Sequence, residues 1–404
     1  MLCGHSRPAP PVTSAPLAVA AALALALCAG PDAPRRPAAP TAAAPPAADT
    51  TLADTTLADS TRARLLTADA LLVDTHIDTP DRLATGVWED VAAATDGGHF
   101  DFPRARRGGL DVAFMSIYVP ARMQASGGAR AYADALIDTV EAVARRAPER
   151  FVVVRSASEA LAVRGTGRVG LALGIENGAA LEGDVAAVRH FRDRGVRYVT
   201  LTHSQPNDLS DPSYGTARPH GGLSPLGERV VAEMNRLGVM VDVSHLSDAA
   251  FDDVLRVSQA PVVATHSSAR HFTPGWERNL DDARIRALGA AGGVLQISFG
   301  SMFITPAYTA ARNRSDPEPP RGTVADVADH VEHVVRIAGI DHVGIGSDFD
   351  GVPSVPVGLD DVAAYPALVA ELLRRGHSEA DLRKLLGENL MRVWQEAERR
   401  GDGA

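Results

Sequence analysis

The feature that most constrains the fold is a regular alternation of short apolar runs and longer amphipathic segments beyond residue 61. The apolar runs cover residues 71–75, 112–119, 169–175, 198–202, 239–244, 261–265, 294–299 and 342–347. Helical spacing of apolar residues follows in 132–146, 225–237, 324–338, 364–375 and 379–399. Nearly continuous apolar runs predict strands that are covered on both faces, as in a parallel sheet. Eight successive βα units favour a (β/α)8 TIM barrel, and an open doubly wound sheet is the alternative.

The first sixty residues do not follow this pattern. Residues 17–29 form an apolar Ala/Leu/Val run, which is typical of an export signal and shorter than the roughly 20 residues that span a membrane. Ala and Pro dominate from residue 31 and cannot supply a packed core. We therefore predict an export signal over 1–30, an Ala/Pro-rich disordered tether over 31–60, and one folded domain with C-terminal helices over 61–404.

Both cysteines, Cys3 and Cys28, lie in this leader. Cys28 is a candidate for bacterial lipid attachment: Leu25 fits the position three residues before it, whereas Leu27 is larger than the residue expected directly before it. The folded domain has neither a disulfide nor a thiolate, so any metal there must be held by His and carboxylate side chains. The net charge of −10 and the lack of a basic stripe argue against a nucleic-acid partner.

Polar side chains gather where the predicted strands end. In chain order they are His76, Asp78, Glu176, His203, His245, His266 and Asp348. A single strand-end histidine is usually a hydrogen-bonded structural residue, and a single acid is often a helix N-cap. Here six of the eight strand ends carry such residues, and active sites of (β/α)8 barrels lie at that rim. The pattern predicts a metal site.

The number of candidate ligands indicates two metals. Histidine and carboxylate ligands suit Zn²⁺, with Co²⁺ or Mn²⁺ as alternatives. Five candidates exceed the three protein ligands that one hydrolytic metal usually takes, whereas two metals that share a carboxylate would use all five. Glu176 is the expected bridge because it projects from a strand between the other candidates. A carboxylated lysine is excluded, since the one lysine, Lys384, lies in a predicted C-terminal helix.

An ordered set of motifs resembles a known family over residues 69–395. The motifs are Val73-Asp74-Thr75-His76-Ile77-Asp78, Gly174-Ile175-Glu176-Asn177-Gly178, Leu201-Thr202-His203-Ser204, Val241-Asp242-Val243-Ser244-His245, Thr265-His266-Ser267-Ser268-Ala269-Arg270, Arg278-Asn279-Leu280 and Gly346-Ser347-Asp348-Phe349-Asp350-Gly351. They are similar to those of the membrane (renal-type) dipeptidases, zinc peptidases of the amidohydrolase superfamily of metal-dependent barrel hydrolases.

The resemblance assigns the metal ligands individually. It implies that His76 and Asp78 bind one zinc, that His245 and His266 bind the other, and that Glu176 bridges the two. It implies attack on the peptide by a hydroxide that bridges the metals. The segment 205–211 departs from the family, which usually carries a Trp there, so the side-chain preference is left unassigned.

The resemblance also assigns the substrate residues. His203 would contact the substrate carbonyl oxygen, Arg278 would lie in the substrate site, and Asp348 would act as the acid/base group. Arg278 and Asp348 could also hold the two charged ends of a dipeptide.

We therefore expect an exported dipeptidase of bacterial type, periplasmic, cell-surface or secreted, whose substrates include some dipeptides with a C-terminal D-residue. A homo-oligomer is left open. One alternative is an amidohydrolase that acts on N-acyl amino acids or lactams. The other is a non-catalytic exported binding protein, whose mark would be a missing ligand or a missing Asp348.

Overall fold

The computed structural model describes residues 50–86 and 88–401. The predicted export signal, Cys28 and the tether as far as residue 49 lie outside the described residues. From Thr50 the chain is helical, in α1 (Thr50–Asp69), so residues 50–60 belong to a helix and not to the predicted tether. The Ala/Pro composition ends before this point, and without proline the segment can continue the helix. Across the described ranges, no helix is both long and apolar enough to cross a membrane.

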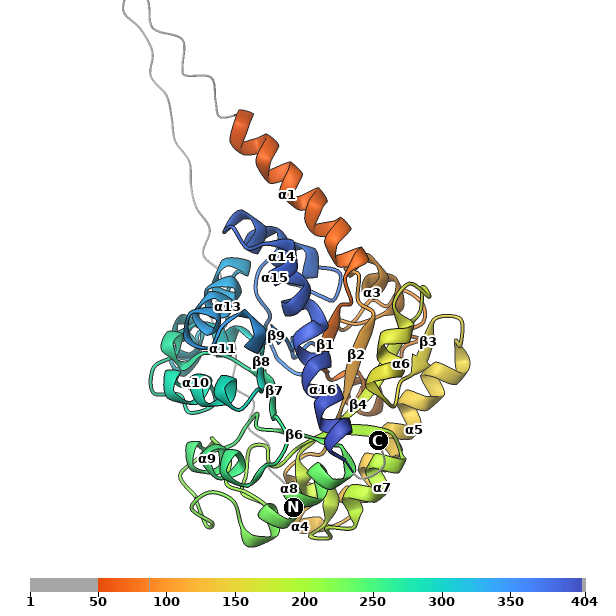
Figure 1. The fold of residues 1–404 in the computed structure, drawn as a ribbon, viewed down its shortest axis with the longest axis vertical. Helices are drawn as coiled ribbons and strands as arrows, with labels where there is room; N and C mark the ends of the chain where they lie inside the picture. Colours follow the sequence, from red (N-terminus) through yellow and green to blue (C-terminus); the bar gives the residue numbers. More distant parts are fainter. Residues whose placement is uncertain (1–49, 87, 402–404) are drawn as a thin grey trace, which may run out of the picture. The chain divides into compact units, whose positions relative to one another are not determined.

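The strands form one parallel sheet that closes into a barrel (Figure 1). Along the barrel they are β1 (Val73–Ile77), β2 (Val112–Tyr118), β4 (Val169–Glu176), β5 (Val196–Thr200), β6 (Met240–Asp242), β7 (Val263–Ser267), β8 (Val294–Ile297) and β9 (Val343–Ile345). Ile77 and Phe349 pair in parallel just beyond β1 and β9, and the Asp78 amide donates to the Phe349 carbonyl at 2.8 Å. The predicted (β/α)8 barrel is confirmed, and the open sheet is excluded.

One strand was not predicted. β3 (Phe151–Val153) pairs with β4 outside the barrel path. Three residues are too short to give an apolar run, and two of the three are only partly buried. The other eight strands agree with the predicted runs, with ends shifted by a few residues.

Helices connect and cover the strands (Figure 1). After α1 they are α2 (Thr79–Thr85), α3 (Phe102–Gly108), α4 (Arg122–Ser126), α5 (Ala129–Arg146), α6 (Ala157–Val163), α7 (Ala187–Asp193), α8 (Pro225–Leu237), α9 (Asp248–Val257), α10 (Asp282–Ala290), α11 (Ser301–Ile304), α12 (Pro306–Asn313), α13 (Val324–Ala338), α14 (Tyr365–Arg374), α15 (Glu379–Arg383) and α16 (Asn389–Arg400). A π-helical turn, Lys384–Glu388, joins α15 to α16. Local signals start several helices: the Ser247 side chain caps α9 by accepting from the Ala250 amide.

The inside of the barrel is filled by alternate strand residues and closed at one end by α16. Val73, Phe114 and Tyr198 pack in one buried cluster with Trp394 of α16, which crosses the strands in Figure 1. Gly174 makes room for the Tyr198 ring, because a Cβ at Gly174 would lie 2.0 Å from it. The opposite end of the barrel, where the strands have their carboxyl ends, is left for a site.

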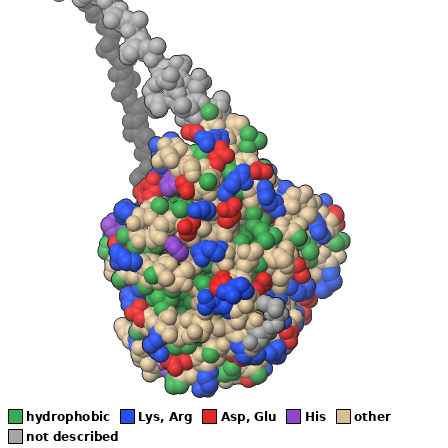
Figure 2. Space-filling view, in the orientation of Figure 1, with side chains coloured by type: hydrophobic (Ala, Val, Ile, Leu, Met, Phe, Trp, Pro, Cys, Tyr) green, Lys and Arg blue, Asp and Glu red, His purple; other side chains and the backbone are tan. Residues whose placement is uncertain are grey.

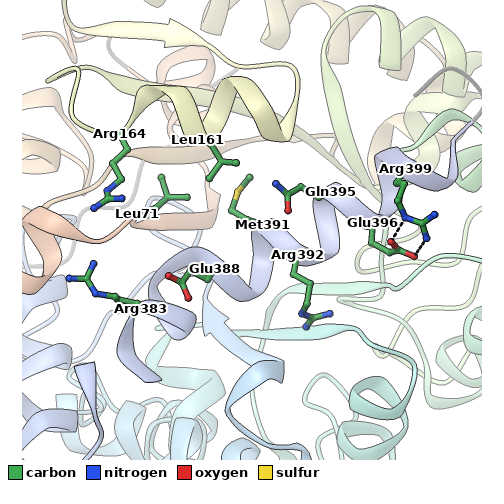
Figure 3. A pocket seen from close by; sticks show the side chains of 10 residues that line it. All are labelled: Leu71, Leu161, Arg164, Arg383, Glu388, Met391, Arg392, Gln395, Glu396 and Arg399. Carbon is green, nitrogen blue, oxygen red and sulfur yellow. Dashed lines mark hydrogen bonds and ion pairs between the residues drawn. The ribbon is translucent and has the colours of Figure 1, made fainter. Parts of the chain in front are cut away.

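A cavity of about 770 Å³ lies at the closed end, lined by residues of α6, α15 and α16 (Figure 3). Its arginines are already bonded within the protein. Arg164 and Arg383 both bond to Asp69, and Arg399 pairs with Glu396. Acidic and basic side chains are interspersed over the face shown in Figure 2.

Candidate active site

A cavity of about 280 Å³ opens at the carboxyl ends of the barrel strands. It gathers residues from distant parts of the chain, most of them polar. They are Asp78, Asp81, Tyr118, Glu176, His203, Tyr214, His245, His266, Met302, Phe303, Asp348, Asp350, Gly351 and Val352. Gly351 permits a close approach, because a Cβ there would lie 2.2 Å from Asp78 Oδ2 and 2.4 Å from Asp348 Oδ1.

The predicted metal ligands meet at the base of this cavity. Three sets of side chains each have ligand atoms within 4.8 Å of one another: His76, Glu176 and His266; Glu176, His203 and His245; and His76, Asp78 and Asp348. All five predicted ligands are in these sets, and the predicted catalytic residues His203 and Asp348 join them. Glu176 is shared by two of the sets.

The two carboxylate oxygens of Glu176 face different histidines. Oε1 lies 3.1 Å from Nε2 of His245 and 3.2 Å from Nε2 of His266. Oε2 lies 3.5 Å from Nε2 of His76. Burial alone would raise the pKa of Glu176, but the four imidazoles around it, His76, His203, His245 and His266, hold it well below its usual value. Glu176 is thus an ionised carboxylate placed between two groups of ligands.

Hydrogen bonds behind His76 fix which nitrogen faces the cavity. The Tyr198 hydroxyl donates to the Thr75 carbonyl at 3.1 Å, so it accepts from Nδ1 of His76 at 3.0 Å. The carboxylates of Asp78 and Glu176 raise the pKa of this buried imidazole, and once the ring is neutral, as a metal ligand must be, Nε2 carries the lone pair. This Nε2 and Asp78 Oδ2 are buried, lie 3.4 Å apart and have no hydrogen-bond partner among the described residues. Two buried acceptors that face each other fit a cation between them.

His245 and His266 are prepared in a similar way. The Thr265 hydroxyl donates to Asp242 at 2.7 Å and can therefore accept from Nδ1 of His266 at 2.8 Å. The Nε2 atoms of His245 and His266 lie 2.8 Å apart. Burial holds the pKa of both imidazoles well below the usual value, so both rings are neutral. Neutral imidazoles beside a carboxylate are the donor set that Zn²⁺ and similar metals take.

The backbone turns sharply where several strands end. His245, Asp348 and Asn177 have φ angles of 67°, 66° and 82°, in the left-handed region that side chains rarely adopt. His245 and Asp348 both line the cavity. Such strain persists where the surrounding structure holds it in place, and it is common at functional sites.

The predicted catalytic residues His203 and Asp348 both border the cavity. Nε2 of His203 lies 3.6 Å from Glu176 Oε1, and burial lowers the pKa of this imidazole. Burial raises the pKa of Asp348 to about 7. The Ser298 hydroxyl lies 3.4 Å from Asp348 Oδ2.

Arg278 is close to the site but does not line the cavity. Its guanidinium is buried and donates to the Ser267 hydroxyl and to the His266 carbonyl, both at 2.7 Å. It also donates to Nε2 of His245 at 3.0 Å. In this arrangement the Arg278 guanidinium contacts the predicted ligands His245 and His266 and does not point into the cavity.

Several residues in or near the cavity were not predicted from the sequence. Tyr118 ends β2, a strand whose predicted run ended in apolar residues, and Tyr214 lies in a long irregular segment with no motif. Asp81 lies three residues after Asp78 in the first turn of α2, where an acid is usual for helix stability alone. Tyr198 points into the barrel, which the alternation of side chains along β5 could have indicated.

Comparison with known proteins identifies the family of the chain. Residues 60–403 match the family described as membrane dipeptidase (peptidase family M19). An uncharacterized dipeptidase of Schizosaccharomyces pombe is 35% identical over 353 residues, which cover 81% of each chain. Dipeptidase verJ of Clonostachys rogersoniana is 36% identical over 347 residues, which cover 82% of this chain and 86% of verJ.

Solved structures give the same result. The probable dipeptidase PvdM from Pseudomonas aeruginosa superposes with a TM-score of 0.79 at 27% identity, over 85% of this chain and 100% of PvdM. A metallo peptidase from Rhodobacter sphaeroides, liganded with a phosphinate mimic of the dipeptide L-Ala-D-Ala, has a TM-score of 0.72 at 30% identity, over 81% and 99% of the chains. The chain belongs to the membrane dipeptidase family, peptidase family M19, a family of metallopeptidases.

Proposed function

We propose that the chain is a binuclear zinc dipeptidase, with Co²⁺ or Mn²⁺ as alternative metals. The observation that carries the proposal is the placement of the two Glu176 oxygens toward different histidines. His76 and Asp78 would hold one metal, His245 and His266 the other, and Glu176 both. When bound, two such metals supply a hydroxide nucleophile at neutral pH and polarise the peptide carbonyl.

The remaining chemistry falls to His203 and Asp348. A neutral His203 can donate an N–H to the substrate carbonyl oxygen as negative charge develops there. Asp348 can take the proton of the attacking water and return it to the leaving amine. A pKa raised to about 7 by burial suits a carboxyl that both accepts and releases a proton near neutral pH.

Arg278 is the proposed partner of the substrate carboxylate. Its hydrogen bond to Nε2 of His245 uses a lone pair that a metal would also require. Coordination of that nitrogen would release one guanidinium N–H for a ligand. A guanidinium beside the cavity suits a carboxylate, because its donors match the geometry of the two oxygens.

The proposed substrates are free dipeptides, including some with a C-terminal D-residue. The Rhodobacter sphaeroides relative holds a mimic of L-Ala-D-Ala, which supports both parts of this proposal. The alternative, an amidohydrolase that acts on N-acyl amino acids or lactams, would have no need for the substrate's ammonium.

A substrate panel tests the proposal. Purified protein loaded with zinc should hydrolyse L-Ala-L-Ala and L-Ala-D-Ala but leave N-acetyl-L-Ala-L-Ala and a lactam essentially intact. Equal rates on the acetylated and free dipeptides would favour the alternative. Tight binding of dipeptides without turnover would favour a non-catalytic binding protein.

We also propose that the protein is exported, on the strength of the apolar run at 17–29. Mass spectrometry of the mature N-terminus tests this. A new terminus near residues 29–33 without lipid is expected. A diacylglyceryl group on Cys28 would instead show lipid attachment, and an intact Met1 would contradict processing.

A further inference from the structure

The cavity has a second acidic position beside the cluster of predicted metal ligands. Asp81, in the first turn of α2, lines the cavity next to Tyr118 at the end of β2. Asp348 follows β9, on the other side of β1 in the barrel order. Tyr118 and Asp348 therefore border the cavity from opposite sides of β1, and Asp81 lies in the helix that follows β1.

The carboxylate of Asp81 is only partly satisfied within the protein. The Tyr132 hydroxyl donates to Oδ1 at 3.2 Å. In the part of the chain that the structure describes, no hydrogen bond reaches Oδ2, and no cation forms an ion pair with Asp81. Burial raises the pKa of Asp81, and Arg122, which is near enough to oppose this rise, is solvent-exposed and makes no such pair. Oδ2 is thus free to accept from a ligand in the cavity.

The surroundings of Asp81 suit a long side chain with a positive end. Tyr118 is partly buried, and its ring lies 4.9 Å from that of His203, which borders the same cavity. Aromatic rings pack well against the methylene stems of lysine and arginine, and their faces attract the cationic groups. A carboxylate just beyond such a ring adds a charge-assisted hydrogen bond.

We propose that Asp81, with Tyr118 beside it, forms a subsite that selects dipeptides whose N-terminal residue has a cationic side chain, arginine or lysine. The inference rests on the proposed dipeptidase function and adds the substrate class. The substrate's own ammonium lies toward Asp348, and the N-terminal side chain extends across β1 toward Asp81.

Three substrates separate the effect of side-chain charge from the effects of side-chain shape and of the ammonium: L-Arg-L-Ala, L-citrulline-L-Ala and L-Ala-L-Ala. Citrulline has nearly the shape of arginine without its charge, and all three carry the same ammonium. The wild-type kcat/KM for the arginine substrate should exceed that for the citrulline substrate by about tenfold, the size expected of one charge-assisted hydrogen bond. In Asp81→Asn, which keeps an acceptor for Tyr132, this ratio should fall to near one.

Two further variants sharpen the test. Asp138→Asn on α5 removes one negative charge from an exposed ion pair with Arg194, and it should keep the wild-type ratio. Arg122→Gln removes the cation that opposes Asp81 and should raise the ratio. Melting temperature and metal content report whether each variant folds.

The outcomes are distinguishable. An arginine-to-citrulline ratio that Asp81→Asn does not change would overturn the subsite. An equal loss on all three substrates would also overturn it, because Asp81 would then serve the ammonium or the fold. A wild-type protein that hydrolyses none of the three would contradict the proposed dipeptidase function itself.

Discussion

Asp348 has both an unfavourable backbone and an unfavourable environment for an aspartate. Its φ of 66° lies in the left-handed region, and the residue is only 6% exposed. A residue that served only as a turn acid would gain nothing from this burial. We infer that the position is maintained because the carboxyl must reach the cavity beside His76 and Asp78.

Replacement of Asp348 by asparagine tests its proposed proton transfer. Asp348→Asn keeps the volume but removes the titratable proton, so we expect a folded protein with unchanged metal content and a kcat on dipeptides at least about a hundredfold lower. Steady-state kinetics with metal analysis measure both. A kcat above about a tenth of the wild-type value would remove Asp348 from the mechanism, and loss of metal would redefine it as a ligand.

Tyr198 acts on the site through His76. Tyr198→Phe removes the acceptor for Nδ1 of His76 and frees the ring to rotate or change tautomer. Loss of such an outer partner typically weakens metal affinity by about 10- to 100-fold. Competition with a zinc chelator measures this affinity. Tyr308→Phe, a substitution in a buried residue of α12 outside the cavity, is the control, and equal affinities in the two variants would contradict the proposed role of Tyr198.

At the scale of elements, α13 holds the loops behind the site in place. The Nδ1 atom of His330 accepts from the Ala269 amide, just after β7, and Nε2 donates to the Ile304 carbonyl at the end of α11, both at 3.0 Å. Burial lowers the pKa of His330 to about 4. The imidazole is therefore neutral in the folded protein and must lose a hydrogen bond to take up a proton.

This pairing predicts an acid sensitivity. An unfolded histidine titrates near pH 6.5, so between pH 6.5 and about 4 the unfolded chain binds more protons at this position than the folded one. The free energy of unfolding therefore decreases as the pH is lowered through this range. The full loss is on the order of 3 kcal/mol. Denaturant unfolding of metal-free wild type and His330→Gln at pH 7, 6 and 5 measures it. The free energy of unfolding should decrease less on acidification in the variant than in the wild type. An equal decrease in both proteins would contradict the role of His330.

The elements that sequence reasoning predicted well are those with a strong repeating pattern. The predicted helices at 225–237 and 324–338 have the same bounds as α8 and α13 because both are amphipathic and have a capping Ser or Thr. β3 was missed because it is three residues long and lies outside the barrel. The helical start at Thr50 was missed because the sequence of 50–60 has no strong pattern of its own.

At the scale of the whole molecule, barrel closure determines how much of the site could be predicted. Strand-end motifs identified His76, Glu176 and His266, because all parallel strands deliver their ends to one rim. Asp81 and Tyr214 could not be predicted in this way. They come from a helix and a long loop, whose approach to the rim depends on tertiary packing.

The central claim is that this rim holds two metals through one shared carboxylate. Calorimetric titration of metal-free protein with Zn²⁺ tests it most directly. The wild type should bind two equivalents tightly, and Glu176→Gln, which changes one oxygen to an amide nitrogen, should bind one or none. A wild type that binds a single equivalent, or a Glu176→Gln variant that still binds two with wild-type affinity, would contradict the two-metal account.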